Sequence, residues 1–305
     1  MNIVIWNQSE TGGGGGIELL LPAINVLIRL YGNINIVGAI CPPGISFTKI
    51  NTIDRQNLKS VAFDLILVTG EDVNVLRTGK QSLFVAVLKE AAALGIDTEK
   101  IVLDRVVLVP NFTLEKYVRL RRSALSILSV NCFGGMLYHR FGLPFLSPTI
   151  NMFTSDEGFL KFLQDPMRNV KAELKLVRTE FNADLNINYP VFKIGESEWD
   201  MNHYADENFA VRKWYERGFR INWFNLLVAM HTENPEILAE FDKLPFAKKV
   251  CFVPFETNLD SGFYVNRANY NNDALWRLVN GIASGGIACY DMWDMLLYGK
   301  KTPLT

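Results

Sequence analysis

Short apolar runs alternate with helix-length amphipathic segments through the first third of the chain. Four runs have the length of buried strands and two longer segments have the period of helices: residues 2–6, 34–41, 63–69 and 100–104, and residues 17–31 and 82–94. Apolar strands separated by helices are typical of parallel sheets with right-handed crossovers. The pattern predicts a doubly wound, Rossmann-like sheet, and a connecting helix at residues 111–122 follows it.

A second α/β unit is predicted from about residue 123. Its expected strands are residues 124–130, 173–179, 191–194, 224–230 and 249–254. Its expected helices are residues 134–141, 156–163, 208–217, 235–243, 273–283 and 290–298. Because single hydrophobic cores stop growing near 300 residues, a chain of 305 residues suits two domains. We predict an α/β domain at residues 1–122 and a second α/β domain at residues 123–305.

Charge and cysteine usage narrow the class of protein. Lys and Arg (31) nearly balance Asp and Glu (32), so no global field for nucleic acid or an anionic membrane is expected. The longest apolar stretch, residues 17–30, contains charged residues and a proline, which favours a buried helix over a membrane span. The first residues read as a core strand, so no signal peptide is expected. The cysteines form no CxxC pair, which indicates reduced thiols in a cytoplasmic protein without a metal cage: Cys41, Cys132, Cys251 and Cys289.

The stretch 126–138 has the most informative pattern in the chain. A buried strand leads into the polar pair Asn131 and Cys132, then into Gly134 and Gly135 and the first turn of a helix. Such a corner places a reactive or binding group at the carboxyl edge of a sheet, and the glycines allow a ligand or another backbone to approach closely. A nucleophilic Cys132 needs a base, and both His139 and His203 are candidates. The alternative is a small buried residue that packs the turn.

Two further groups are candidates for ligand binding. Ser147 and Thr149 flank a proline in a rigid turn, where their hydroxyls could bind sugar or phosphate oxygens or cap the next helix. His203 and Arg217 could meet a diphosphate, because a guanidinium offers forked hydrogen bonds. The alternative there is structural, since the charges at 212, 216 and 220 share one helix face and can pair with each other.

A run of five glycines follows the first predicted strand. Gly12 and Gly14 could cradle a phosphate at a helix N-terminus. However, Ile17 occupies the place of the third glycine of a dinucleotide fingerprint, and no acidic residue ends the second strand. Phosphate binding is therefore favoured over a nicotinamide cofactor, a flexible surface loop is the alternative, and the sequence leaves the cofactor open.

The remaining acids and histidines have local explanations. Asp156 and Glu157 follow Thr154 and Ser155, so a helix capped by Ser155 or Thr154, with acids in its first turn, accounts for them. His231 is assigned to a loop after a strand. No DxD pattern stands at a strand end, which counts against the commonest type of metal-dependent glycosyltransferase, and no metal site is predicted.

Three stretches of the second unit carry a family resemblance. They are residues 131–135 continuing to 143–151, residues 202–204 followed by 213–217 and 220–222, and residues 240–250. From about Ser123 onward the chain resembles the uncharacterised bacterial exopolysaccharide biosynthesis proteins, in which a tryptophan often stands where this chain has Phe133. The first unit, in turn, is similar to small Rossmann-like domains found beside polysaccharide enzymes.

The resemblance implies a role in making or modifying surface polysaccharide. The leading hypothesis is a transferase-like protein that binds a nucleotide-sugar or sugar-phosphate. One alternative is a non-catalytic nucleotide-sensing or assembly protein of the same pathway, and another is cysteine-dependent acyl transfer or hydrolysis at Cys132. The sequence leaves open whether the protein is an enzyme, and it gives no oligomeric state.

Overall fold

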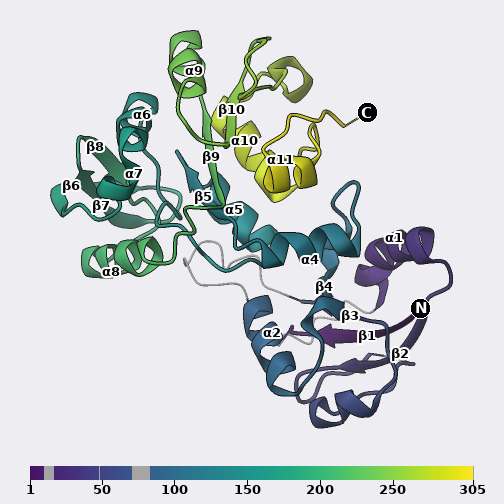
Figure 1. Ribbon diagram of the computed structural model, residues 1–305. Helices are drawn as coiled ribbons and strands as arrows, with labels where there is room; N and C mark the ends of the chain where they lie inside the picture. The colour runs from purple at the N-terminus through teal and green to yellow at the C-terminus, as the bar shows by residue number, and fades with distance from the viewer. Residues whose placement is uncertain (10–16, 48, 71–82, 305) are drawn as a thin grey trace. The chain divides into compact units, whose positions relative to one another are not determined.

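The computed structural model describes residues 1–9, 17–47, 49–70 and 83–304 (Figure 1). Gly12 and Gly14 lie outside the described residues. The chain divides into two compact units. The first takes most of the chain up to Val118 together with Arg140–Pro144, and the second takes Arg119–His139 and the chain from Phe145 onward. Among the described residues, no helix combines the length and apolar character that a membrane crossing requires.

The first unit is built on sheet A, whose four parallel strands have the order β2-β1-β3-β4. The strands are β1 (Asn2–Asn7), β2 (Asn35–Ile40), β3 (Leu65–Thr69) and β4 (Ile101–Leu103). Successive strands are added on opposite sides of β1, which is the order of a doubly wound sheet. The main helices of this unit are α1 (Leu21–Tyr31) and α2 (Leu83–Ala93), and a short helix, α3 (Asp104–Val107), follows β4.

The second unit contains sheet B, in which β11-β10-β9-β5 are all parallel. Its strands are β5 (Ser126–Ser129), β9 (Leu226–His231), β10 (Lys248–Val253) and β11 (Gly262–Tyr264). The helices of this part of the chain are α5 (Phe133–Arg140), α6 (Asp156–Gln164), α7 (Pro166–Asn169), α8 (Glu207–Gly218), α9 (Pro235–Asp242), α10 (Leu275–Ser284) and α11 (Met292–Tyr298). The predicted α/β class with parallel sheets is confirmed. A further helix, α4 (Leu114–Arg122), contains the division between the units.

The two faces of sheet B pack against different helices, because side chains alternate along each strand. On one face Leu128, Val228 and Val253 share a core with α6 and α9. On the other face the ring of Phe252 lies 5.3 Å from that of Phe133 in α5, and α10 packs on β9 and β10. Figure 1 shows α6 and α9 on one side of β9 and β10, with α10 and α11 on the other.

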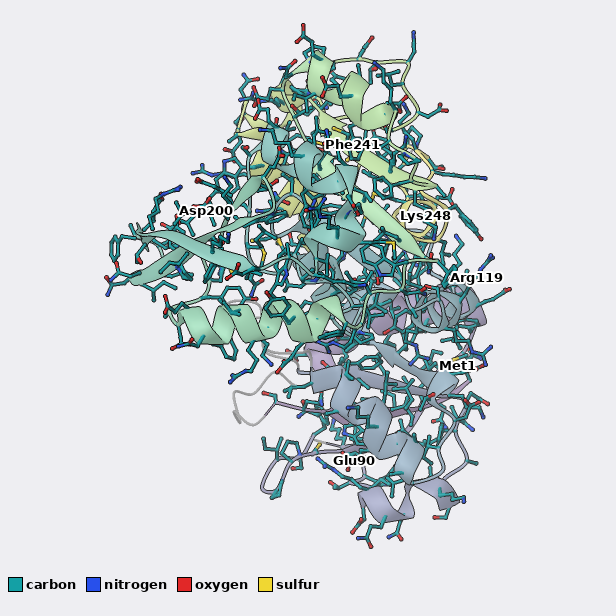
Figure 2. All side chains as sticks on the ribbon, turned by 60° about the vertical axis from the view of Figure 1, so that its left-hand side comes forward. Met1, Glu90, Arg119, Asp200, Phe241 and Lys248 are labelled. Atoms are coloured by element: carbon teal, nitrogen blue, oxygen red, sulfur yellow. The ribbon has the colours of Figure 1, made fainter. Side chains whose placement is uncertain are left out.

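The second unit also contains a small antiparallel sheet, sheet C, with the order β6-β7-β8. Its strands are β6 (Leu174–Asn182), β7 (Ile187–Ile194) and β8 (Ser197–Asp200). The fully buried Trp199 of β8 packs edge-on against Phe162 of α6 and Trp214 of α8. Phe241 of α9 is fully buried in the same core and is labelled with Asp200 of β8 in Figure 2.

Candidate functional site at the carboxyl edge of sheet B

The ends of β5 and β9 lie next to each other in sheet B. Ser129 pairs with Ala229, and the Val130 amide continues the ladder by donating to the Ala229 carbonyl at 3.1 Å. Asn131 and His231 therefore follow at the same level on adjacent strands. In open parallel α/β sheets ligands bind outside this carboxyl edge, so the residues around it form the candidate site.

Cys132 and His203 are in contact at this edge. The Cys132 Sγ lies 3.6 Å from the His203 Nε2. Cys132 caps α5, since its carbonyl accepts from the Met136 amide at 3.0 Å. His203 lies in the turn between β8 and α8. Of the two histidines considered as a base for Cys132, the structure brings His203 to the thiol and places His139, 4% exposed, two turns along α5.

Burial favours the uncharged form of the Cys132 thiol. Burial raises the pKa of the Cys132 thiol to about 12, although part of the residue stays exposed. The thiol is therefore protonated at neutral pH, and the contact with His203 does not begin from a thiolate. A reaction at Cys132 would need His203 to take the thiol proton as the new bond forms.

Asn131 joins the end of β5 to two helices. Its Oδ1 accepts from the Phe133 amide at 3.1 Å, which caps α5. Its Nδ2 lies 3.4 Å from the Oδ1 of Asn280, in α10. Asn131 is thus held by the protein on both sides of its amide, and it links the Cys132 corner to α10.

Gly134 and Gly135 face the protein itself. A Cβ at Gly134 would lie 2.8 Å from the Ser129 Oγ, and one at Gly135 would lie 3.3 Å from the Ile150 side chain. Both glycines are buried. The close approach that they permit is therefore that of α5 to β5 and to the loop around residue 150.

Ser147 and Thr149 are fully buried in the loop beside β5. The Thr149 Oγ1 accepts from the Ser129 amide at 3.0 Å and lies 3.1 Å from the Ser147 Oγ. These hydroxyls tie the loop to β5 and have no surface exposed to a ligand.

Arg217 is also buried, with 2% of its surface exposed. It donates from Nη1 to the Tyr204 hydroxyl at 2.5 Å, and its guanidinium lies 5.2 Å from the centre of the Phe145 ring. Tyr204 in turn donates to the Ile150 carbonyl at 2.9 Å. Arg217 therefore anchors the residue next to His203, while Arg212 and Glu216 form the expected exposed ion pair at 3.8 Å.

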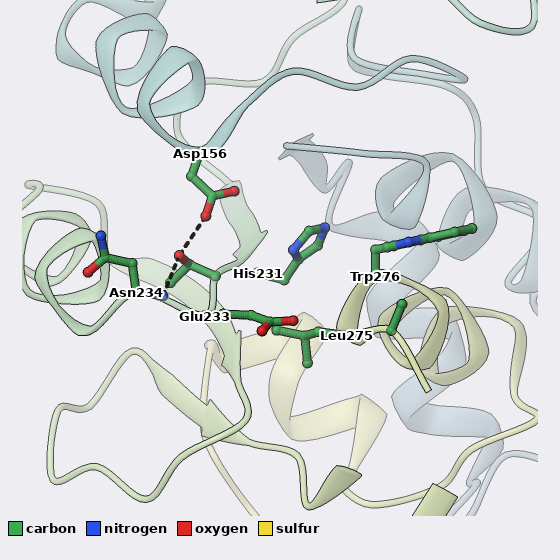
Figure 3. Close-up of a pocket in the computed structure, with 8 residues that line it drawn as sticks. Asp156, His231, Glu233, Asn234, Leu275 and Trp276 are labelled. Atoms are coloured by element: carbon green, nitrogen blue, oxygen red, sulfur yellow. Dashed lines mark hydrogen bonds between the residues drawn. The ribbon is translucent and has the colours of Figure 1, made fainter. Parts of the chain in front are cut away.

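A pocket of about 410 Å³ opens beside this corner, at the end of β9 (Figure 3). Its walls come from the end of β9, the first turn of α6, the start of α9 and the start of α10. The residues that line it are Asp156, His231, Thr232, Glu233, Asn234, Ala274, Leu275 and Trp276. The assignment of His231 to a loop is therefore wrong: it is the last residue of β9 and faces a pocket.

Hydrogen bonds fix the polar wall of the pocket. Thr232 donates from Oγ1 to the Asp156 Oδ2 at 2.6 Å and accepts from the Asn234 amide at 3.1 Å. The Asn234 Oδ1 caps α9 by accepting from the Glu236 amide at 2.8 Å. The groups that this wall can offer a ligand are the carboxyl groups of Asp156 and Glu233 and the Asn234 Nδ2.

Burial shifts the pKa values of Asp156 and His231 in the pocket in opposite directions. It raises the pKa of Asp156, and the neighbouring charges of Glu157 and Glu233 add to that effect. It lowers the pKa of His231 to about 4, so this imidazole is neutral at physiological pH. Environments that separate the pKa values of neighbouring groups are typical of functional sites.

The family of the chain is decided by a match over this region. A family model described as "Domain of unknown function (DUF1919)" matches residues 104–298, which is more than half of the chain. The chain belongs to the DUF1919 family. The match includes Cys132, His203 and every residue of the pocket. The predicted membership of an uncharacterised family over the second part of the chain is confirmed to this extent.

A relative of this DUF1919 protein comes from Haemophilus influenzae and is described as "Uncharacterized protein". It is 33% identical over 146 residues, which are 47% of this chain and 66% of the relative. The chain thus spans just under two thirds of that relative's length.

The pocket residues of this DUF1919 protein were missed because each one has a sufficient local explanation in the sequence. Asp156 follows the cap Ser155, whose Oγ accepts from the Gly158 amide at 3.0 Å as predicted. Trp276 stands in an amphipathic helix. A usable signal was the polar run 231–234 at the end of a buried strand. Within the described residues, no group of three or more His, Cys, Asp or Glu is placed to hold a metal ion.

Proposed function

We propose that this protein is a transferase-like protein of surface polysaccharide assembly, acting on a nucleotide-sugar or sugar-phosphate at the carboxyl edge of sheet B. The observation that carries the proposal is the 3.6 Å contact between the Cys132 Sγ and the His203 Nε2. Two polar residues, 71 positions apart in the chain, meet at the edge where parallel α/β sheets bind ligands. The polysaccharide link comes from the family resemblance of the second unit.

In this proposal His203 accepts the proton that the transferred group or its acceptor loses during the transfer. Burial raises the pKa of Cys132 to about 12, so the thiol that contacts His203 is neutral. In this proposal the contact positions the His203 ring at the carboxyl edge of sheet B. Neutral imidazole is the form that can accept a proton from an attacking hydroxyl. Arg217 donates a hydrogen bond to the hydroxyl of Tyr204, which is the neighbour of His203 in the chain, and so helps to fix this segment.

The contact also favours a second candidate, acyl transfer or hydrolysis through Cys132 itself. In that reaction the thiol proton moves to His203, the sulfur forms a thioester with the acyl group, and the leaving group takes up the proton. The raised thiol pKa makes this route slow without bound substrate. Alkylation by iodoacetamide at neutral pH separates the candidates, because a nucleophilic Cys132 reacts faster than the other cysteines and an inert one does not.

The test of the proposal is a thermal-shift screen against nucleotide-sugars, nucleotides, sugar phosphates and NAD(P), each with and without magnesium or manganese. A ligand that binds the native state raises the Tm by mass action. We expect a shift with one nucleotide-sugar or sugar phosphate that is lost in His203→Ala and kept in Arg212→Ala, an exposed control on α8. No shift with any compound overturns the proposal and favours the non-catalytic assembly protein.

A further inference from the structure

The pocket at the end of β9 is distinct from the Cys132–His203 pair but adjoins it. Trp276 lines the pocket, and Asn280, one turn further along α10, lies 3.4 Å from the side chain of Asn131. Asn131 precedes Cys132 in the chain. The helix that forms one wall of the pocket therefore also contacts the corner that presents the thiol.

The charges of the pocket disfavour a phosphate group. Among the described residues that line it there is no Lys or Arg, whereas Asp156 and Glu233 are acidic. Proteins bind phosphate with forked guanidinium or ammonium donors, and the described lining supplies none of these beside its two carboxyl groups. A nucleotide or sugar phosphate does not fit this pocket.

The same charges give little support to a cationic ligand. Glu233 already pairs with Arg267, whose Nη1 lies 3.1 Å from its Oε1. The Trp276 ring already has the guanidinium of Arg277 at 5.1 Å from its centre, and Arg277 also pairs with Asp273 at 3.3 Å. A second cation at this ring would be repelled by the first.

An exposed aromatic ring beside hydrogen-bonding groups suits a neutral sugar. Trp276 is 48% exposed, which is high for a side chain of this size in a pocket wall. A pyranose has an apolar face of C–H groups that can pack on an indole and a rim of hydroxyls. The Asp156 carboxyl can accept from those hydroxyls and the Asn234 Nδ2 can donate to them. Figure 3 shows Trp276 on the α10 side of the pocket and Asp156 and Asn234 on the opposite side, with His231 between them.

We propose that this pocket binds a neutral saccharide, with Trp276 as the stacking platform and Asp156 and Asn234 as hydrogen-bonding partners. Its volume of about 410 Å³ lies within the usual range of roughly 300–1,000 Å³ for small-molecule sites. The saccharide is the acceptor of the transfer reaction, an assignment that rests on the proposed function. In this proposal donor and acceptor occupy neighbouring parts of one edge of sheet B.

The experiment titrates the full chain with neutral disaccharides containing glucose, galactose, mannose or rhamnose, and in parallel with glucose 1-phosphate and glucosamine. Binding is followed by isothermal titration calorimetry and tryptophan fluorescence. We expect at least one neutral disaccharide to bind more tightly than the charged sugars. Trp276→Ala should weaken that binding roughly tenfold, since the loss of stacking costs about 1.4 kcal/mol. Asp156→Asn should also weaken it.

Phe219→Ala is the matched control, because Phe219 is an aromatic residue that is 86% exposed and does not line the pocket. Equal binding by the Trp276 and Phe219 variants, tighter binding of a charged sugar, or no binding of any neutral disaccharide overturns the inference. The Tm of each variant checks its folding. A nucleotide-sugar shift without disaccharide binding refutes the acceptor pocket alone, whereas disaccharide binding without any donor shift refutes the proposed transfer function.

Discussion

The carboxyl ends of β5 and β9 are neighbours in sheet B, yet their polar residues are used differently. After β5, Ser147, Thr149 and Gly134 are buried and their space or hydrogen bonds are taken up by the protein. After β9, Asp156, His231 and Trp276 surround an open pocket. Most polar and small residues of the glycine-rich corner after β5 therefore serve packing around the Cys132–His203 contact, while an open pocket lies one strand away.

The largest effect on stability is expected from Arg217, which is buried against Tyr204 and Phe145. Replacing it by Ala leaves a cavity and removes the partner of the Tyr204 hydroxyl. We expect a loss of about 2–4 kcal/mol of unfolding free energy, and a Tm lower by about 5–15 °C. Arg212→Ala, on the exposed side of α8, should change stability by less than about 0.5 kcal/mol. Urea denaturation and calorimetry measure both. An unchanged Tm in Arg217→Ala, with ligand binding lost, would return Arg217 to the binding site.

The pH dependence of stability tests the burial of His231 at the end of β9. The pKa of His231 is lowered to about 4 from an ordinary value near 6.5, so the unfolded chain takes up a proton at a higher pH than the folded one. The contribution of His231 to the free energy of unfolding is fully present above about pH 6.5. It falls by about 3 kcal/mol as the pH decreases to about 4. The raised pKa of Asp156 acts in the opposite direction and offsets part of the loss.

The measurement is urea denaturation of the wild type and His231→Asn between pH 7 and pH 4. We expect the variant to lose less stability than the wild type over this interval, because it lacks the group that must stay neutral. Parallel curves for the two proteins would mean that the His231 ring is solvated as an exposed loop residue, and the contrast between the two strand ends would weaken.

The two glycines of α5 provide a smaller and more local test. In Gly134→Ala the new Cβ would lie 2.8 Å from the Ser129 Oγ, which is itself fixed by a bond to the Asn131 carbonyl at 2.7 Å. We expect a net loss of about 1–2 kcal/mol, since overpacking exceeds the gain in helix propensity. Gly135→Ala has its nearest contact at 3.3 Å and should be neutral within about 0.5 kcal/mol. Equal stabilities, with ligand binding lost only in Gly134→Ala, would show that the space belongs to a ligand.

Local patterns were sufficient to predict most of the fold. The strand and helix around Cys132 were expected at 124–130 and 134–141 and are found as β5 and α5, because hydrophobic period and turn residues act within a few positions. The predicted strands 173–179 and 191–194 exist, but they pair in the separate antiparallel sheet C. Strands β8 and β11, of four and three residues, were missed. Such short strands carry almost no periodicity, and their pairing depends on distant partners.

The candidate site was harder to predict than the fold, because it depends on contacts between distant segments. Cys132 and His203 could each be named from the sequence, but only the folded chain shows which histidine meets the thiol. The pocket draws Asp156, His231 and Trp276 from three segments, and each is locally explained by a helix cap, a strand end or an amphipathic helix. A sequence pattern shows the role of a residue in its own helix or strand, but not its contacts with residues of other elements.

The smallest expected effect concerns the hydrogen bond that orients the carboxyl group of the pocket. Thr232→Val removes the donor to the Asp156 Oδ2, at 2.6 Å, and the acceptor of the Asn234 amide. We expect a loss of about 1 kcal/mol and a further rise in the pKa of Asp156, since the Thr232 hydroxyl lowers it in the wild type. Carboxyl carbon NMR across a pH titration measures the pKa. Ser155→Ala is the control, because loss of this cap on the same helix also costs about 1 kcal/mol but leaves the Thr232 bond in place. If the pKa of Asp156 is the same in Thr232→Val and the wild type, its carboxyl group is positioned by the first turn of α6 alone. The end of β9 then lines the pocket but does not orient this carboxyl group.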